Sequence, residues 1–77
     1  MKTFVMIRRS DESGVSGVGA VLEGAVFSTG ETIVRWRGEH GSVNIFRSLD
    51  SFLAIHVNSH PTNGTRIQFS DGTSIEL

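Results

Sequence analysis

The chain has 77 residues, which is enough for one small domain, residues 1–77, with a thin hydrophobic core. Its net charge of −1 argues against a general electrostatic attraction to nucleic acid or membranes, and the absence of cysteine excludes disulfides and thiolate metal sites. There is no signal-peptide pattern and no apolar run of membrane-spanning length, so we expect a soluble, cytoplasmic protein.

The first two strands are expected over residues 3–9 and 18–28. Residues 3–9 are β-forming, contain no turn residue and place apolar side chains on both faces, which predicts a central or well-covered strand. The polar, glycine-bearing residues 10–17 predict a loop. The second segment is long for one flat strand, so we expect a bulge or a bend at Gly24.

A third strand is expected over residues 31–37, where the alternation is clear. Val34 and Trp36 share one face, which we predict to be the core face, and Arg35 and Arg37 lie side by side on the outer face.

A fourth strand and the only helix are expected next. Residues 42–47 predict a strand with Val43 and Ile45 on one face, and Ile45 is a core candidate. Ser48 is a candidate N-cap, because its hydroxyl can accept a hydrogen bond from the first turn of a helix. Apolar residues then recur at helical spacing, which predicts one short amphipathic helix: Leu49, Phe52, Leu53 and His56 or Val57.

The C-terminal part is expected to form a hairpin. Residues 65–69 and 73–77 predict two strands, and Asp71-Gly72 is typical of a two-residue turn. The sequence FSDGTSI in this hairpin matches FSTGETI, residues 27–33, in its Phe, Ser, Gly and Ile. A duplication would explain the match, but the unmatched flanking residues favour two hairpins that use the same turn chemistry.

The predicted fold is α+β and mostly β. It is a small twisted antiparallel sheet, or a partly closed barrel, of five to six strands with one short helix in the order β-β-β-β-α-β-β. The core candidates are Phe4, Met6, Val21, Val26, Val34, Trp36, Ile45, Leu49, Phe52, Leu53, Ile67 and Phe69.

The stretch SGVSGVG has the small residues of a phosphate-binding loop. Such loops usually lead into a helix, whereas here a strand is expected to follow, and no Lys-Ser or Lys-Thr comes after the glycines. We therefore favour a simple connection between strands. An anion site remains an alternative, because Arg8 and Arg9 end the preceding strand and Ser13, Gly14 and Ser16 offer hydroxyl and backbone N–H groups.

The outer arginines raise a question of charge. All but one of the seven cations are arginine, whose planar fork suits carboxylates and phosphates. Arg35 and Arg37 repel each other unless a carboxylate or a ligand lies between them. With a two-residue turn at Thr29-Gly30, Glu23 lies opposite Trp36, and only a bulge moves it onto the arginine face.

Two further hypotheses rest on aromatic and histidine residues. An exposed Trp36 would let a nucleobase stack beside the arginines, as in a nucleic-acid-binding module. His56 or His40 would be the candidate base of a small hydrolase, although no nucleophile motif accompanies them and we do not expect an enzyme. Neither a metal site nor a cofactor is expected, because Pro61 prevents His56 and His60 from sharing one helix.

From Asp11 onward the chain resembles a group of small uncharacterised proteins of bacteriophages and actinobacteria. The resemblance rests on DESGVSGVGAVLEGAVFSTGE, IVRWRG and SLDSFLAIH. These proteins continue into a Gly-His-Gly-Gly-type stretch, where this sequence has VNSHPTNGT after Ile55-His56. The resemblance implies a phage-type origin and no assigned activity.

The favoured function is a small phage-type accessory binding protein of the host cytoplasm. It would inhibit a host defence by sequestering an anionic ligand such as a nucleotide signal, or a host protein. A homo-oligomer is also expected, because a thin core without disulfides gains buried area from a second subunit. The candidate ligand-binding residues are Arg8, Ser13, Gly14, Ser16, Arg35, Arg37 and His56.

Overall fold

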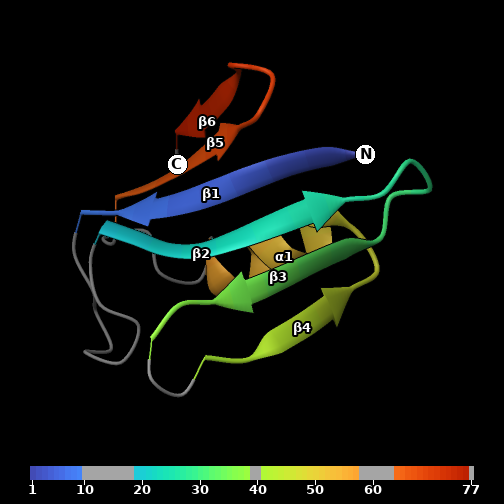
Figure 1. The fold of residues 1–77 in the computed structure, drawn as a ribbon, viewed down its shortest axis with the longest axis horizontal. Coiled ribbons are helices and arrows are strands. Elements are labelled where there is room, and N and C mark those ends of the chain that lie inside the picture. Colours follow the sequence, from blue (N-terminus) through green and yellow to red (C-terminus); the bar gives the residue numbers. More distant parts are fainter. Residues whose placement is uncertain (10–18, 39–40, 58–63, 77) are drawn as a thin grey trace.

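The computed structural model describes residues 1–9, 19–38, 41–57 and 64–76. They form a six-stranded antiparallel sheet in the order β4-β3-β2-β1-β5-β6, with one helix against it (Figure 1). The sheet is open and not closed into a barrel, and the expected order of elements is confirmed. The elements are β1 Lys2–Arg8, β2 Gly19–Val26, β3 Thr32–Trp36, β4 Val43–Phe46, α1 Leu49–His56, β5 Thr65–Phe69 and β6 Ser74–Glu76.

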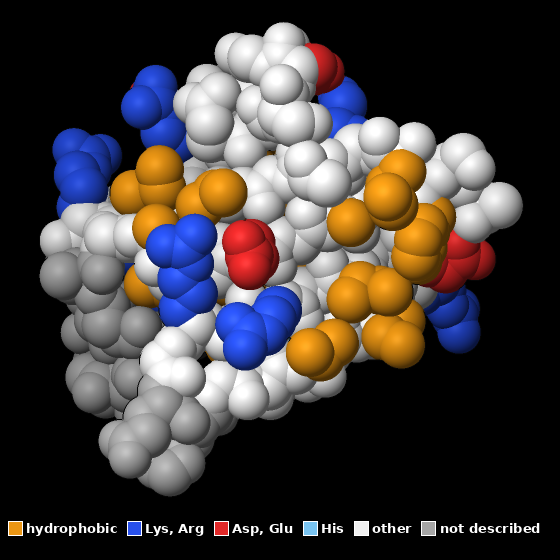
Figure 2. All heavy atoms as spheres, in the orientation of Figure 1, with side chains coloured by type: hydrophobic (Ala, Val, Ile, Leu, Met, Phe, Trp, Pro, Cys, Tyr) orange, Lys and Arg blue, Asp and Glu red, His pale blue; other side chains and the backbone are white. Residues whose placement is uncertain are grey.

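The sheet has two unlike faces. Helix α1 packs against one of them, here called the helix face, and lies behind the sheet in Figure 1. No described helix covers the opposite face, here called the open face, which Figure 2 presents to the viewer. Strand β1 lies between β2 and β5 and is apolar on both faces, as predicted for a central strand.

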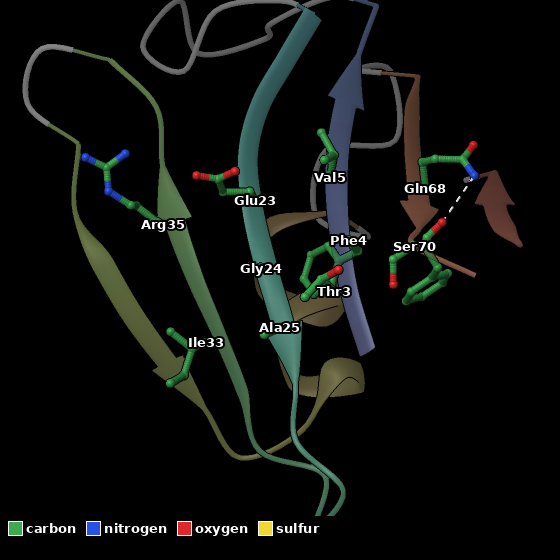
Figure 3. Close-up of a pocket in the computed structure, with 11 residues that line it drawn as sticks. Thr3, Phe4, Val5, Glu23, Gly24, Ala25, Ile33, Arg35, Gln68 and Ser70 are labelled. Atoms are coloured by element: carbon green, nitrogen blue, oxygen red, sulfur yellow. Dashed lines mark hydrogen bonds between the residues drawn. The ribbon is translucent and has the colours of Figure 1, made fainter. Parts of the chain in front are cut away.

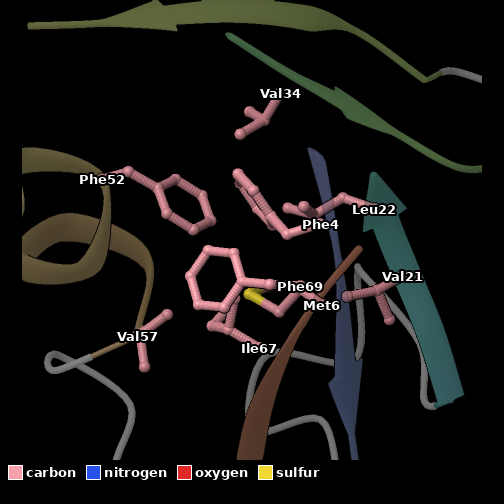
Figure 4. Packing of buried hydrophobic residues seen from close by; sticks show 9 residues of the cluster. All are labelled: Phe4, Met6, Val21, Leu22, Val34, Phe52, Val57, Ile67 and Phe69. Atoms are coloured by element: carbon pink, nitrogen blue, oxygen red, sulfur yellow. The ribbon is translucent and has the colours of Figure 1, made fainter. Parts of the chain in front are cut away.

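The hydrophobic core lies between the sheet and α1 (Figure 4). The centre of the Phe52 ring, on the helix, lies 6.2 Å from the centre of the Phe4 ring and 5.3 Å from the centre of the Phe46 ring. Most of the predicted core residues are buried or partly buried, while Leu22 and Val57 were missed. The buried residues are Phe4, Met6, Val21, Leu22, Val34, Phe52, Val57, Ile67 and Phe69.

The prediction of Ile45 as a core residue is wrong. Ile45 pairs with Ile33 across β3 and β4, so it lies on the open face and is 73% exposed. The alternate residues of β4, Asn44 and Phe46, point towards the helix. Phe46 packs on Phe52 there, and Asn44 accepts a hydrogen bond from Trp36 Nε1 at 3.0 Å. This register buries the larger aromatic ring and satisfies the indole N–H.

The predicted irregularity in β2 occurs at Val21, not at Gly24. Met6 pairs with Leu22, but the next residue of β1 pairs with Ala20, so Val21 is the extra residue of a β-bulge. Val21 and Leu22 are consequently both buried.

Gly24 is needed for a different reason, which is close packing. It pairs directly with Phe4, and the Phe4 ring lies over it. A Cβ atom at position 24 would come within 2.4 Å of the Phe4 ring and 2.9 Å of the Ile33 carbonyl oxygen. Only a residue without a side chain fits between them.

The two matching sequences form the same kind of hairpin loop. Gly30 N–H donates to the Phe27 carbonyl at 2.9 Å, and Gly72 N–H donates to the Phe69 carbonyl at 3.1 Å. Both glycines have positive φ, +104° and +93°, as the last residue of a three-residue loop does. The predicted two-residue turns are therefore wrong by one residue, and the shared sequence corresponds to shared turn chemistry.

Helix α1 begins at the position that the sequence predicts. The Ser48 hydroxyl accepts a hydrogen bond from Ser51 N–H at 3.1 Å, which confirms the N-cap of α1.

Among the described residues, no helix combines the length and the apolar character needed to cross a membrane.

The loop of the C-terminal hairpin makes a further contact with β1 through Asp71. Its carboxylate accepts hydrogen bonds from the Thr73 hydroxyl at 2.6 Å and the Thr73 N–H at 2.9 Å, and Lys2 Nζ lies 3.1 Å away. These contacts, those with Thr73 first, lower the pKa of Asp71 to about 2.

Replacement of Gly24 by alanine should destabilise the fold by about 1–3 kcal/mol, because a Cβ overpacks the Phe4 ring. Chemical denaturation measures the change. Ala25→Ser, one residue along β2, is the control and should stay within about 0.5 kcal/mol of the parent. Equal stability of the Gly24→Ala protein and the parent would contradict the packing argument.

Asp71→Asn should lower the melting temperature at pH 7, and the difference should shrink as the pH falls from about 4 to about 2. The folded pKa of Asp71 is depressed, so its stabilisation is present above the unfolded pKa, about 3.9, and is lost as pH falls towards 2. Melting curves of both proteins from pH 7 to pH 2 test this. A difference that does not change with pH would show that the charge is not responsible.

Candidate functional site

Three charged side chains gather in the middle of the open face. Glu23 on β2 pairs directly with Arg35 on β3, and Arg37 Nη2 lies 3.9 Å from Glu23 Oε2. Arg35 is exposed, and the Arg37 and Glu23 side chains are 48% and 54% exposed. Figure 2 shows the acidic group between basic groups at the centre of this face.

The hairpin loop explains why Glu23 is there. The three-residue loop shifts the pairing of β2 and β3 by one residue from the register expected for a two-residue turn. Leu22 takes the place opposite Trp36, and Glu23 moves onto the face of Arg35. The bulge at Val21 affects the β1 side of β2 and is not needed for this placement.

A hollow of about 640 Å³ lies beside this cluster on the open face. Ala25 and Gly24 form a flat strip of β2 along it, with Val5 and Ile33 on the neighbouring strands. Figure 3 shows Arg35 and Glu23 on one side of the hollow and Gln68 and Ser70 on the other. The hollow therefore joins an apolar strip to a cation and to hydrogen-bonding side chains.

A smaller hollow of about 320 Å³ adds two more arginines at the far end of β1 and β5. Arg9 and Arg66 line it together with Ile7 and Glu76. Arg66 Nε lies 3.2 Å from Glu76 Oε1. Among the described residues, the central cluster and the smaller hollow together contain four arginines and two glutamates, so this side carries an excess of positive charge.

Arg8 and His56 lie together on the helix face. Arg8 is only 4% exposed, and its Nη2 donates a hydrogen bond to the His56 carbonyl oxygen at 3.0 Å, at the end of α1. A cation at a helix C-terminus is stabilised by the helix dipole. The Arg8 guanidinium carbon lies 5.5 Å from the centre of the Trp36 ring. The centre of the His56 ring lies 5.1 Å from the same point.

Trp36 is partly buried on the helix face, as the structural interpretation predicts. It packs against the core, Arg8 and His56, and its Nε1 donates to Asn44. It therefore does not share a face with Arg35 and Arg37, as a base-stacking residue of those arginines would.

The predicted site residues thus form two groups on opposite faces of the sheet. Arg8 and His56 are together on the helix face, and Arg35 and Arg37 are together on the open face. Ser13, Gly14 and Ser16, and also His40, lie outside the described residues. In the part of the chain that the structure describes, no group of three or more His, Cys, Asp or Glu residues could hold a metal ion.

The sequence interpretation missed Gln68 and Ser70 at the hollow. Gln68 alternates with the inward residues of β5, so its outward position was readable from the strand pattern. Its position across the hollow from Arg35 depends on β5 pairing with β1, which no local pattern reveals.

A model of a protein family described as Acb5 phage protein matches residues 1–71. The chain belongs to this family. No curated protein and no solved structure matches it. Membership of the Acb5 phage protein family confirms the resemblance to phage proteins and fits a small phage accessory protein, while the link to actinobacterial proteins stays a prediction.

Arg8→Gln should destabilise the protein by about 1.5–3 kcal/mol, because it removes a buried, charge-assisted hydrogen bond to the helix end. Denaturant unfolding is the measurement. Arg9→Gln is the matched control, since Arg9 is the exposed neighbour of Arg8, and it should be nearly neutral. Equal effects of the two substitutions would show that Arg8 does not hold α1 to β1.

Proposed function

We propose that this protein is a phage accessory protein that sequesters an anionic ligand on the open face of its sheet. The ligand class that fits best is a nucleotide, such as a signal used by a host defence, and the protein would act in the host cytoplasm. The observation that carries the proposal is the pair Arg35 and Arg37 beside an apolar hollow that no described helix covers.

The hollow has the size and composition of a small-molecule site. Its volume of about 640 Å³ falls within the range of ligand pockets, about 300–1,000 Å³. The strip at Gly24 and Ala25 is flat enough for a planar ring, with Val5 and Ile33 giving apolar contact on either side. The Gln68 side-chain NH2 group donates to the Thr73 carbonyl oxygen at 3.2 Å, so the Gln68 carbonyl oxygen and the Ser70 hydroxyl are the groups that would contact a base edge at the far side.

The arginines supply the anion contact. Their guanidinium forks match phosphate oxygens in a bidentate manner, which a lysine ammonium does not. The distance of 3.9 Å between Arg37 Nη2 and Glu23 Oε2 exceeds a hydrogen bond, so this contact is a loose ion pair. Exposed pairs of this kind contribute little, up to about 1 kcal/mol, and a phosphate can replace the carboxylate as the partner of the guanidinium.

Glu23 gives the proposed site a second property. The Glu23 carboxylate offsets part of the positive charge of Arg35 and Arg37 when no ligand is bound, and it repels an anion that approaches. It therefore reduces non-specific anion binding and selects ligands that also use the apolar strip. This follows because inorganic phosphate gains the arginine contacts alone, whereas a nucleotide gains the ring contact as well.

Native mass spectrometry of the protein purified from phage-infected or expressing cells tests the proposal directly. A co-purifying mass that matches a nucleotide supports it, and a bound host protein would identify the partner as a macromolecule. Protein that carries neither, and that binds none of a panel of mono-, di-, tri- and cyclic nucleotides in calorimetry, would contradict sequestration of this ligand class.

Arg35→Ala should lower the affinity for the nucleotide that binds best in the panel at least tenfold and leave the melting temperature nearly unchanged. The reason is that Arg35 is exposed on the open face and contributes little to the core. Glu23→Gln should raise the affinity, because it removes the repelling carboxylate. Arg47→Ala, another exposed arginine but outside the hollow, is the control and should bind normally. Unchanged affinity of the Arg35→Ala protein would remove Arg35 from the site.

A further inference from the structure

Strand β4 forms an edge of the sheet that no other described element covers. Among the described residues it pairs with β3 alone, and its sequence from Val43 to Phe46 contains no charge, no proline and no bulge. Proteins usually protect such edges, because free backbone groups pair with another strand. The opposite edge, β6, is shorter and carries Glu76, which pairs with Arg66.

The backbone pattern identifies which groups of β4 are free. Trp36 N–H donates to the Ser42 carbonyl at 2.9 Å, so position 42 is hydrogen-bonded to β3. In an antiparallel ladder the bonded positions alternate, so Asn44 is bonded to β3 while the N–H and C=O groups of Val43 and Ile45 point outward. The side chains of these same two residues are 60% and 73% exposed.

We propose that a second copy of the chain pairs with β4 in antiparallel fashion, with Asn44 of one copy opposite Asn44 of the other. Val43 of each copy then lies opposite Ile45 of the other, at hydrogen-bonded positions. The outward N–H and C=O groups of both residues form four hydrogen bonds across the two-fold axis. The two sheets become one sheet of twelve strands.

This register is self-complementary, which is why the occupant is a second copy. A shift by one residue would put the exposed side chains on opposite faces. A shift by two residues would bring Val43 opposite Arg47 in one direction, and in the other it would bring Ile45 opposite Gly41, which lies outside the strand. The chosen register clusters four apolar side chains on the joined open face, next to Ile33, which pairs with Ile45 in each copy.

The size of the contact predicts its strength. Two four-residue strands with two exposed apolar side chains each make a contact smaller than a standard specific interface, which buries about 1,200–2,000 Å². The dimer should therefore be reversible and concentration-dependent. It would place the two Arg35 residues on one continuous face, about 16 Å apart, because they are separated by three strand spacings and by two residues along the strands.

Ile45→Lys tests the proposal, because a lysine on the edge repels its counterpart in the second copy. Sedimentation from low to high micromolar concentration should show the parent rising from 8.4 kDa towards twice that mass, while the variant stays monomeric. Ile55→Lys is the matched control, since Ile55 is 56% exposed on the helix, and it should dimerise normally. A parent that stays monomeric, or an Ile45→Lys protein that still dimerises, would overturn the proposal.

Cysteine cross-linking tests the register itself, because the chain has no cysteine. In the proposed register residue 44 faces itself at a non-hydrogen-bonded pair, with Cα atoms about 4.5 Å apart, which a disulfide can bridge. Mild oxidation should therefore convert Asn44→Cys to a covalent dimer and leave Ser74→Cys, on the other edge, monomeric. Equal cross-linking of both would overturn the register. Neither experiment depends on nucleotide binding, so this proposal and the proposed function can fail separately.

Discussion

The register between β2 and β3 determines what the two faces of the sheet can do. It is set by a three-residue loop that closes on Gly30, whose φ of +104° is available to glycine at little cost. In this register Trp36 lies opposite Leu22 and packs on the core, and Glu23 lies opposite Arg35 on the open face. A shift of one residue would move every side chain of β3 relative to β2 and would separate Glu23 from the arginines.

A single helix can cover only one face of a six-stranded sheet, and this division separates structural from accessible residues. On the helix face, Arg8 has a structural role, because it joins β1 to the end of α1 and packs on Trp36. On the open face, Arg35 and Arg37 lie beside an apolar hollow without a comparable structural role. Residues that look alike in the sequence therefore have different environments, and burial distinguishes them.

The sequence was sufficient for the elements that depend on local patterns. The strict alternation in β3 predicted the faces of Trp36 and Arg35, and the Ser48 hydroxyl predicted the start of α1. The pattern failed in β4, where Val43, Ile45 and Phe46 are all apolar. Either Val43 and Ile45 or the alternate residues Asn44 and Phe46 could therefore face the core. Packing against Phe52 decided between them, and that contact joins residues that no short-range rule connects.

The candidate site was predictable only in part for the same reason. The adjacency of Arg35 and Arg37 follows from strand geometry, but the position of Glu23 depends on whether a turn has two or three residues. The hollow depends on the pairing of β1 with β5, which brings Gln68 to the side opposite Arg35. The glycine at position 24 suggested an irregular strand, although its role is to leave room for the Phe4 ring.

The central claim is that the open face is the binding surface. The most direct measurement is an NMR titration of the isotope-labelled protein with the same panel of mono-, di-, tri- and cyclic nucleotides. The account predicts that amide shifts change along the hollow, at Val5, Glu23, Ala25 and Arg35, and stay constant in α1. Changes centred on α1, or no changes with any nucleotide, would contradict it.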